Sequence, residues 1–99
     1  MFLYLLTALL WASDPATDIA TASNPKLDQL TRQSAFNRLV DTGATEIQVI
    51  INVSQDAAAD TRQRWVAIRA LGKIKGPQAE QVLLRLISEK EPAIRAASL

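Results

Sequence analysis

Apolar residues recur along the second half of the chain at the three- and four-residue steps of an amphipathic helix. After Asp60 this pattern places Ala67, Ile68 and Leu71 on one face, where they can pack against a neighbouring helix. A second stripe follows Pro77 with the same periodicity, at Ala79, Val82, Leu83, Leu86 and Ile87. The pattern predicts two consecutive helices joined by a short turn.

The pattern recurs at a nearly constant spacing. Asp28, Asp60 and Glu91 begin three similar segments that start 32 and 31 residues apart. In each segment an arginine follows the acid four residues later, and a small and then a large apolar residue come after it. The positions assigned to this repeat are Asp28, Arg32, Asp60, Arg64, Ala67, Leu71, Gly72, Glu91 and Arg95. Such a period is typical of stacked helix pairs, in which each acid and its arginine would form a weak surface pair.

The second helix of the earlier copy is less certain from sequence alone. Val49, Ile50 and Val53 match the later apolar stripe, but residues 47–53 are rich in β-branched side chains that also suit a strand. The match to the later copy favours a helix. Gly43 is expected to mark the turn before this helix, and Gly72 to end the first helix of the later copy.

The later copy resembles a HEAT repeat of the bacterial type related to phycobilisome lyase-like repeats. The resemblance is carried by the motif Asp60-x-x-x-Arg64-x-x-Ala67-x-x-Ala70-Leu71-Gly72-Lys73-Ile74-x-Gly76-Pro77-x-Ala79. It implies an all-α fold, an α-solenoid of antiparallel helix pairs whose inner helices line a concave, partner-binding face. Within residues 24–99, the expected boundaries are about 26–56 for repeat 1, about 58–89 for repeat 2 and about 91–99 for the start of repeat 3. Because that third copy is incomplete, further repeats are expected beyond Leu99.

The N-terminal residues have the features of an export signal. Residues 2–12 form an uncharged apolar run, too short for a bilayer span of about 20 residues. Ala20-Thr21-Ala22 provides a cleavage site before Ser23, so 1–22 would be a leader and the mature protein periplasmic or extracellular. In the alternative, residues 2–12 form a buried repeat helix, Asp14-Pro15 begins another helix, and the protein is cytoplasmic.

The composition excludes most catalytic chemistry. The chain has no His, which is the usual general base at neutral pH, and no Cys, which is the soft thiolate ligand of many metal sites. No phosphate-binding loop or nucleophile motif is present, so we expect no catalytic residues, no metal and no cofactor. The net charge of +1 gives no general case for nucleic-acid binding.

These observations favour a non-catalytic scaffold that binds a protein or peptide partner. The expected partner-binding residues are polar positions on the inner helices: Gln48, Asn52, Glu80, Gln81 and Arg85. One alternative is an accessory domain of a longer enzyme, such as a bilin lyase or another modifying enzyme. A nucleic-acid-binding helical repeat is the weaker alternative. Trp65 is expected to pack over the neighbouring repeat rather than contact a partner, and the local cations form a solvated face: Arg62, Arg69, Lys73 and Lys75.

Overall fold

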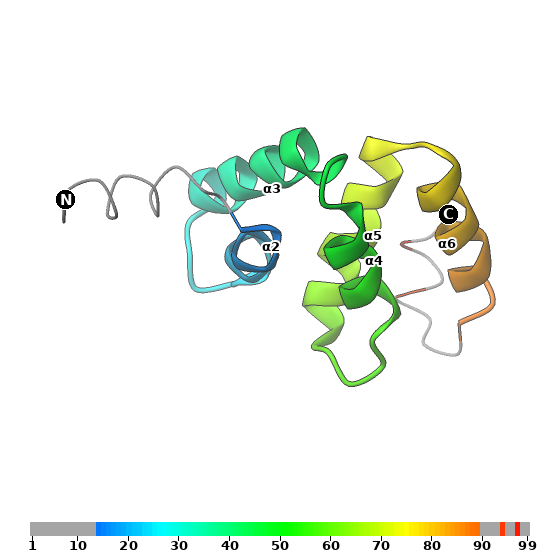
Figure 1. Ribbon diagram of the computed structural model, residues 1–99. Coiled ribbons are helices and arrows are strands. Elements are labelled where there is room, and N and C mark those ends of the chain that lie inside the picture. Colours follow the sequence, from blue (N-terminus) through cyan, green and yellow to red (C-terminus); the bar gives the residue numbers. More distant parts are fainter. Residues whose placement is uncertain (1–13, 90–93, 95–96, 98–99) are drawn as a thin grey trace, which may run out of the picture.

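The computed structural model describes residues 14–89 together with Ile94 and Ala97. This part of the chain is all-helical and contains no strand (Figure 1). Its helices are α2 (Pro15–Ser23), α3 (Gln29–Gly43), α4 (Ile47–Gln55), α5 (Thr61–Ile74) and α6 (Pro77–Leu86). None of them is long and apolar enough to cross a membrane. The predictions for residues 2–12, Glu91 and Arg95 lie outside the described residues.

Helix α2 begins where the sequence offers a start signal. The Asp14 carboxylate accepts a hydrogen bond of 3.3 Å from the backbone N–H of Ala16, and Pro15 occupies the first helical position. On the inner face of α2, Ile19 is only 1% exposed. The helix packs against α3 and α5, so the predicted cleavage site at Ala20–Ala22 lies within an element of the folded domain.

Several of the matched residues occupy the same positions on α3 and α5. Asp28 and Asp60 occupy the N-cap positions of α3 and α5. Two further pairs, in which every residue is 0% exposed, are Ala35 with Ala67 and Leu39 with Leu71. The spacing of small and large apolar residues therefore predicts the buried faces of both helices.

The segment after Gly43 is helical, as the match between the copies predicts. Helix α4 buries Ile50, Ile51 and Ser54, and α6 buries Ala79, Val82 and Leu86. The β-branched residues of α4 are thus accommodated in a helix because their side chains face a common core.

The closest helix contacts join neighbours across the expected repeat boundaries. Helix α2 packs most extensively along α3, and α4 packs most extensively along α5, whereas α3 and α4 make little contact. The prediction that repeat 1 forms an antiparallel helix pair is therefore wrong, because its two helices pack on other neighbours instead of on each other. Alternate helices also touch, since α3 contacts α5 and α4 contacts α6. Figure 1 shows α4 leaving the end of α3 in a different direction. The all-α prediction is confirmed, and the shared core extends from Ile19 to Ile94.

The prediction that Gly72 ends a helix is wrong. Helix α5 continues to Ile74 and ends where Lys75 and Gly76 adopt positive φ angles of 64° and 101°. The stop is therefore set by the backbone of residues 75 and 76, of which Gly76 tolerates that region freely. Gly72 is exposed inside the helix, and a Cβ added there would meet no atom within 4 Å.

Replacing Gly72 with Ala is expected to raise the free energy of unfolding by about 0.5–1 kcal/mol. Alanine restricts the unfolded chain and suits a helix interior, and here it meets no steric obstacle. Urea denaturation followed by circular dichroism measures the change. Gly43→Ala is the contrasting variant: its Cβ would lie 2.5 Å from Ile74 Cδ1 and 2.7 Å from Ile50 Cδ1, so no such gain is expected. Equal gains in both variants would contradict the assignment.

Candidate functional site

The five predicted partner-binding residues are all exposed on α4 and α6. On α4, Gln48 and Asn52 lie one turn apart, and the Gln48 Nε2 group donates a hydrogen bond of 2.9 Å to Asn52 Oδ1. This bond orders two amide side chains on the solvent face while Ile50 and Ile51 face the core. The remaining Asn52 amide N–H groups and Gln48 oxygen can bind a partner.

The other three predicted residues lie on α6, outside its buried apolar face. Glu80, Gln81 and Arg85 are exposed, and α6 begins at Gly76-Pro77, where proline suits the first helical position. Helices α4 and α6 touch, but no hydrogen bond or ion pair joins the polar residues of one to those of the other among the described residues. The structure thus brings Gln48 and Asn52 together and leaves the three α6 residues as separate exposed groups.

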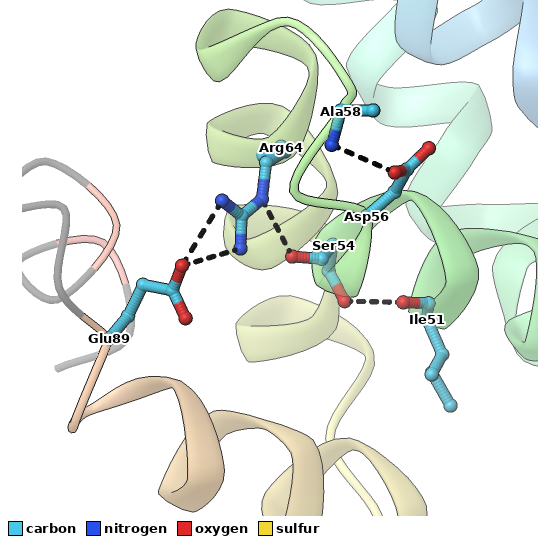
Figure 2. Close-up of polar contacts among 6 residues, drawn as sticks. All are labelled: Ile51, Ser54, Asp56, Ala58, Arg64 and Glu89. Carbon is cyan, nitrogen blue, oxygen red and sulfur yellow. Dashed lines mark hydrogen bonds and ion pairs between the residues drawn. The ribbon is translucent and has the colours of Figure 1, made fainter.

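The repeat arginine of the second copy is a buried structural residue, and the prediction of a surface pair is wrong for it. Arg64 is 3% exposed; its Nε donates to the Ser54 carbonyl oxygen at 3.1 Å, and both terminal nitrogens lie 3.3 Å from Glu89 Oε1 (Figure 2). It therefore connects the C-terminal end of α4 to the segment that follows α6. The Ser54 hydroxyl donates in turn to the Ile51 carbonyl at 2.7 Å. The sequence could not show this because the partners lie ten and 25 residues away.

The acid of the first copy, Asp28, caps the N-terminus of α3. Asp28 Oδ1 accepts a hydrogen bond of 2.7 Å from the Thr31 backbone N–H. Hydrogen bonding from Thr31 lowers the pKa of Asp28; desolvation opposes this shift, and the nearby charge of Arg32 adds a smaller lowering. A lowered pKa means that this cap stabilises the fold above the unfolded pKa of aspartate, and the contribution is lost as pH falls through the folded value.

Sequence reasoning missed a groove between α5 and the α2–α3 pair. Two adjoining hollows, of about 430 and 420 Å³, share the residues Ala22, Arg32, Trp65 and Val66. Trp65 is 43% exposed and lines both hollows, so its role in packing over the neighbouring repeat stays a prediction. The only sequence feature that pointed to this groove was the helical spacing of four residues: Arg62, Trp65, Arg69 and Lys73. Their cations were predicted to form a solvated face.

The described residues contain no group of three or more acidic, His or Cys side chains placed to hold a metal ion. The ion pairs that they contain, Arg38 with Asp18 and Arg64 with Glu89, join helices or segments rather than line a hollow. Comparisons with protein-family models, curated proteins and solved structures found no match to the chain.

Proposed function

We propose that the chain is a non-catalytic binding module of HEAT-like helical repeats, which binds a protein partner through the exposed polar face of α4 and α6. The observation that carries this proposal is the division of both helices into a buried apolar face and an exposed polar one. Helix α6 buries Ala79, Val82 and Leu86 while Gln81 and Arg85 remain exposed. Amide and guanidinium groups on neighbouring helices offer directional hydrogen bonds to a protein surface.

The equivalence of the two copies supports the repeat part of the proposal. Equivalent N-cap acids and equivalent buried Ala and Leu positions on α3 and α5 are expected if one helix is a repeat of the other. Contacts between α3 and α5 and between α4 and α6 are also those expected when like helices stack on one another. Such stacking presents side chains of successive helices as one extended surface.

The place of α2 refines the proposal on export. Cleavage before Ser23 would remove Ile19 from the core and would remove the Asp18 carboxylate, which accepts a hydrogen bond of 3.3 Å from Arg38 Nε. We therefore propose that α2 belongs to the mature domain. Export, if it involves residues 2–12, leaves residues 15–22 attached to the folded protein.

Site-specific photo-crosslinking tests the proposed face. A photoreactive amino acid is placed at Asn52 or Gln81 in cells that express the protein, where it is expected to give a discrete protein adduct. The same amino acid at Asp41, an exposed position on α3, is the control and should give no adduct. The double variant Gln81→Ala/Arg85→Ala should weaken crosslinking at Asn52 at least about fivefold. Its melting temperature should not change, because both side chains are exposed. Equal adducts at Asn52 and Asp41, or adducts removed by nuclease, would overturn the proposal.

A further inference from the structure

The groove between α5 and the α2–α3 pair is separate from the α4–α6 face and has a distinct chemistry. Its cations are Arg32 of α3 and three residues of α5: Arg62, Arg69 and Lys73. We name this surface, with Trp65 between its two hollows, the basic groove. No carboxylate lines either hollow. Charge of one sign is thus concentrated in a concave surface of a chain whose net charge is only +1.

The groove cations are available to an occupant. None of the four takes part in an ion pair within the described residues, whose ion pairs involve Arg38 and Arg64 instead. Arg62, Arg69 and Lys73 are exposed; Arg32 is partly buried, and its Nε is a buried donor with no acceptor. A buried donor without an acceptor is unusual in a folded protein, and Arg32 places this one at the wall shared by both hollows.

The length of the groove follows from helix geometry. Arg62, Arg69 and Lys73 lie at steps of seven and four residues, which place them on one stripe of α5. At 1.5 Å per residue the stripe is about 16 Å long, which is the length of about five residues of extended peptide. Apolar and amide groups line the same path, with Val66 and Phe36 beside Gln29 and Gln33.

We propose that the basic groove binds an extended acidic peptide segment of a partner protein, in which carboxylates alternate with apolar side chains. The carboxylates would pair with the guanidinium and ammonium groups, and the apolar residues would contact Trp65, Val66 and Phe36. The glutamine amides of α3 can bond to the main chain of such a segment. This proposal rests on the proposed function in one respect, that the partner is a protein, and it adds a second contact surface with its own chemistry.

The observations favour a peptide over single-stranded nucleic acid. The Arg69 guanidinium lies 5.1 Å from the centroid of the Trp65 ring, so one face of the indole is already covered by a cation. A stacking platform for bases needs an open aromatic face. The affinity of a nucleic acid also depends on how many phosphates are neutralised, and the groove supplies four cations along a short path.

Fluorescence of Trp65 tests the proposal directly. In a Trp11→Phe background Trp65 is the remaining tryptophan of the chain. The titrants are a capped peptide of about six residues with alternating Glu and Leu, the same peptide with Gln for Glu, and a short oligothymidylate. The acidic peptide is expected to change Trp65 emission saturably, and its affinity should fall as NaCl rises from about 50 mM to about 500 mM.

Matched charge variants locate the site. Lys73→Gln should weaken binding about threefold and Arg62→Gln/Arg69→Gln about tenfold, in line with the loss of exposed ion pairs. Lys75→Gln is the matched control: it removes the same charge two residues further on, outside the groove, and should leave the affinity unchanged. Melting temperatures of the variants confirm that each is folded.

Each other outcome overturns the proposal in a recognisable way. Equal binding of the Gln peptide would remove the role of charge, and tighter binding of the oligothymidylate would assign the groove to nucleic acid. An equal loss of peptide affinity in Lys73→Gln and Lys75→Gln would show that the peptide is attracted by the general positive charge rather than by the basic groove. Absence of any Trp65 response would remove the groove as a site, while crosslinking at Asn52 and Gln81 would still report on the α4–α6 face independently.

Discussion

Replacing Arg64 with Met is expected to lower the free energy of unfolding by about 3 kcal/mol. The substitution keeps most of the buried volume but removes the donors that reach the Ser54 carbonyl and Glu89. A buried carbonyl then loses its partner and a partly buried carboxylate loses its cation, and the loss of one member of such a pair costs several kcal/mol. Urea denaturation, read by circular dichroism, measures the change.

The first copy of the repeat provides the matched control for this variant. Arg32 occupies the same repeat position, but it is partly exposed and makes none of the corresponding hydrogen bonds, so Arg32→Met should cost less than about 1 kcal/mol. Glu89→Gln retains an acceptor oxygen for the guanidinium and should cost about 1 kcal/mol. A loss in Arg64→Met no larger than that in Arg32→Met would show that the buried network contributes little to stability.

Removing α2 is expected to abolish cooperative unfolding of the domain. A chain that begins at Ser23 lacks the helix that packs against both α3 and α5, and their apolar faces would become solvent-exposed. The point substitution Ile19→Ala should by itself cost about 3 kcal/mol, because Ile19 is 1% exposed and its loss leaves a cavity. Thermal melts of both proteins measure these effects.

Leu30→Ala is the control for that experiment. Leu30 is 80% exposed on α3, and shortening it should change the free energy of unfolding by no more than about 0.5 kcal/mol. Mass spectrometry of the mature N-terminus gives the complementary result, since we expect residues 15–22 to be retained. A chain starting at Ser23 that melts like the longer protein would show that α2 is dispensable and that cleavage there is compatible with folding.

The helices of the two copies were predictable because helical periodicity is a local property. The stripes through Ala67 and Leu71 and through Val82 and Leu86 are buried as their spacing indicates. The choice between strand and helix for residues 47–53 was made by comparison with the other copy rather than by residue preference, and these residues lie in α4. The predicted helix end at Gly72 was wrong because an exposed glycine can lie inside a helix, and the positive φ angles of later residues determine where this helix ends.

The pairing of helices and the basic groove depend on packing between distant segments, which periodicity does not encode. The repeat pattern treats Arg32 and Arg64 as equivalent, yet one lines a groove and the other is buried against Ser54. The proximity of Arg32 to Trp65 and Arg62 requires α3 and α5 to lie together, which only the assembled fold shows. Helix α2 was predicted only as the alternative to a cleaved leader, since small residues near an apolar run suit a cleavage site as well as a helix.

The helix pairing described above also bears on how quickly the native state is reached. In two cases, α2 with α3 and α4 with α5, a helix packs most closely on the next one along the chain, across a connection of only a few residues. Short connections make chain closure inexpensive in entropy, and topologies dominated by such local contacts cross a low kinetic barrier. The contacts of α5 with both α2 and α3 then join these two halves into one folded unit.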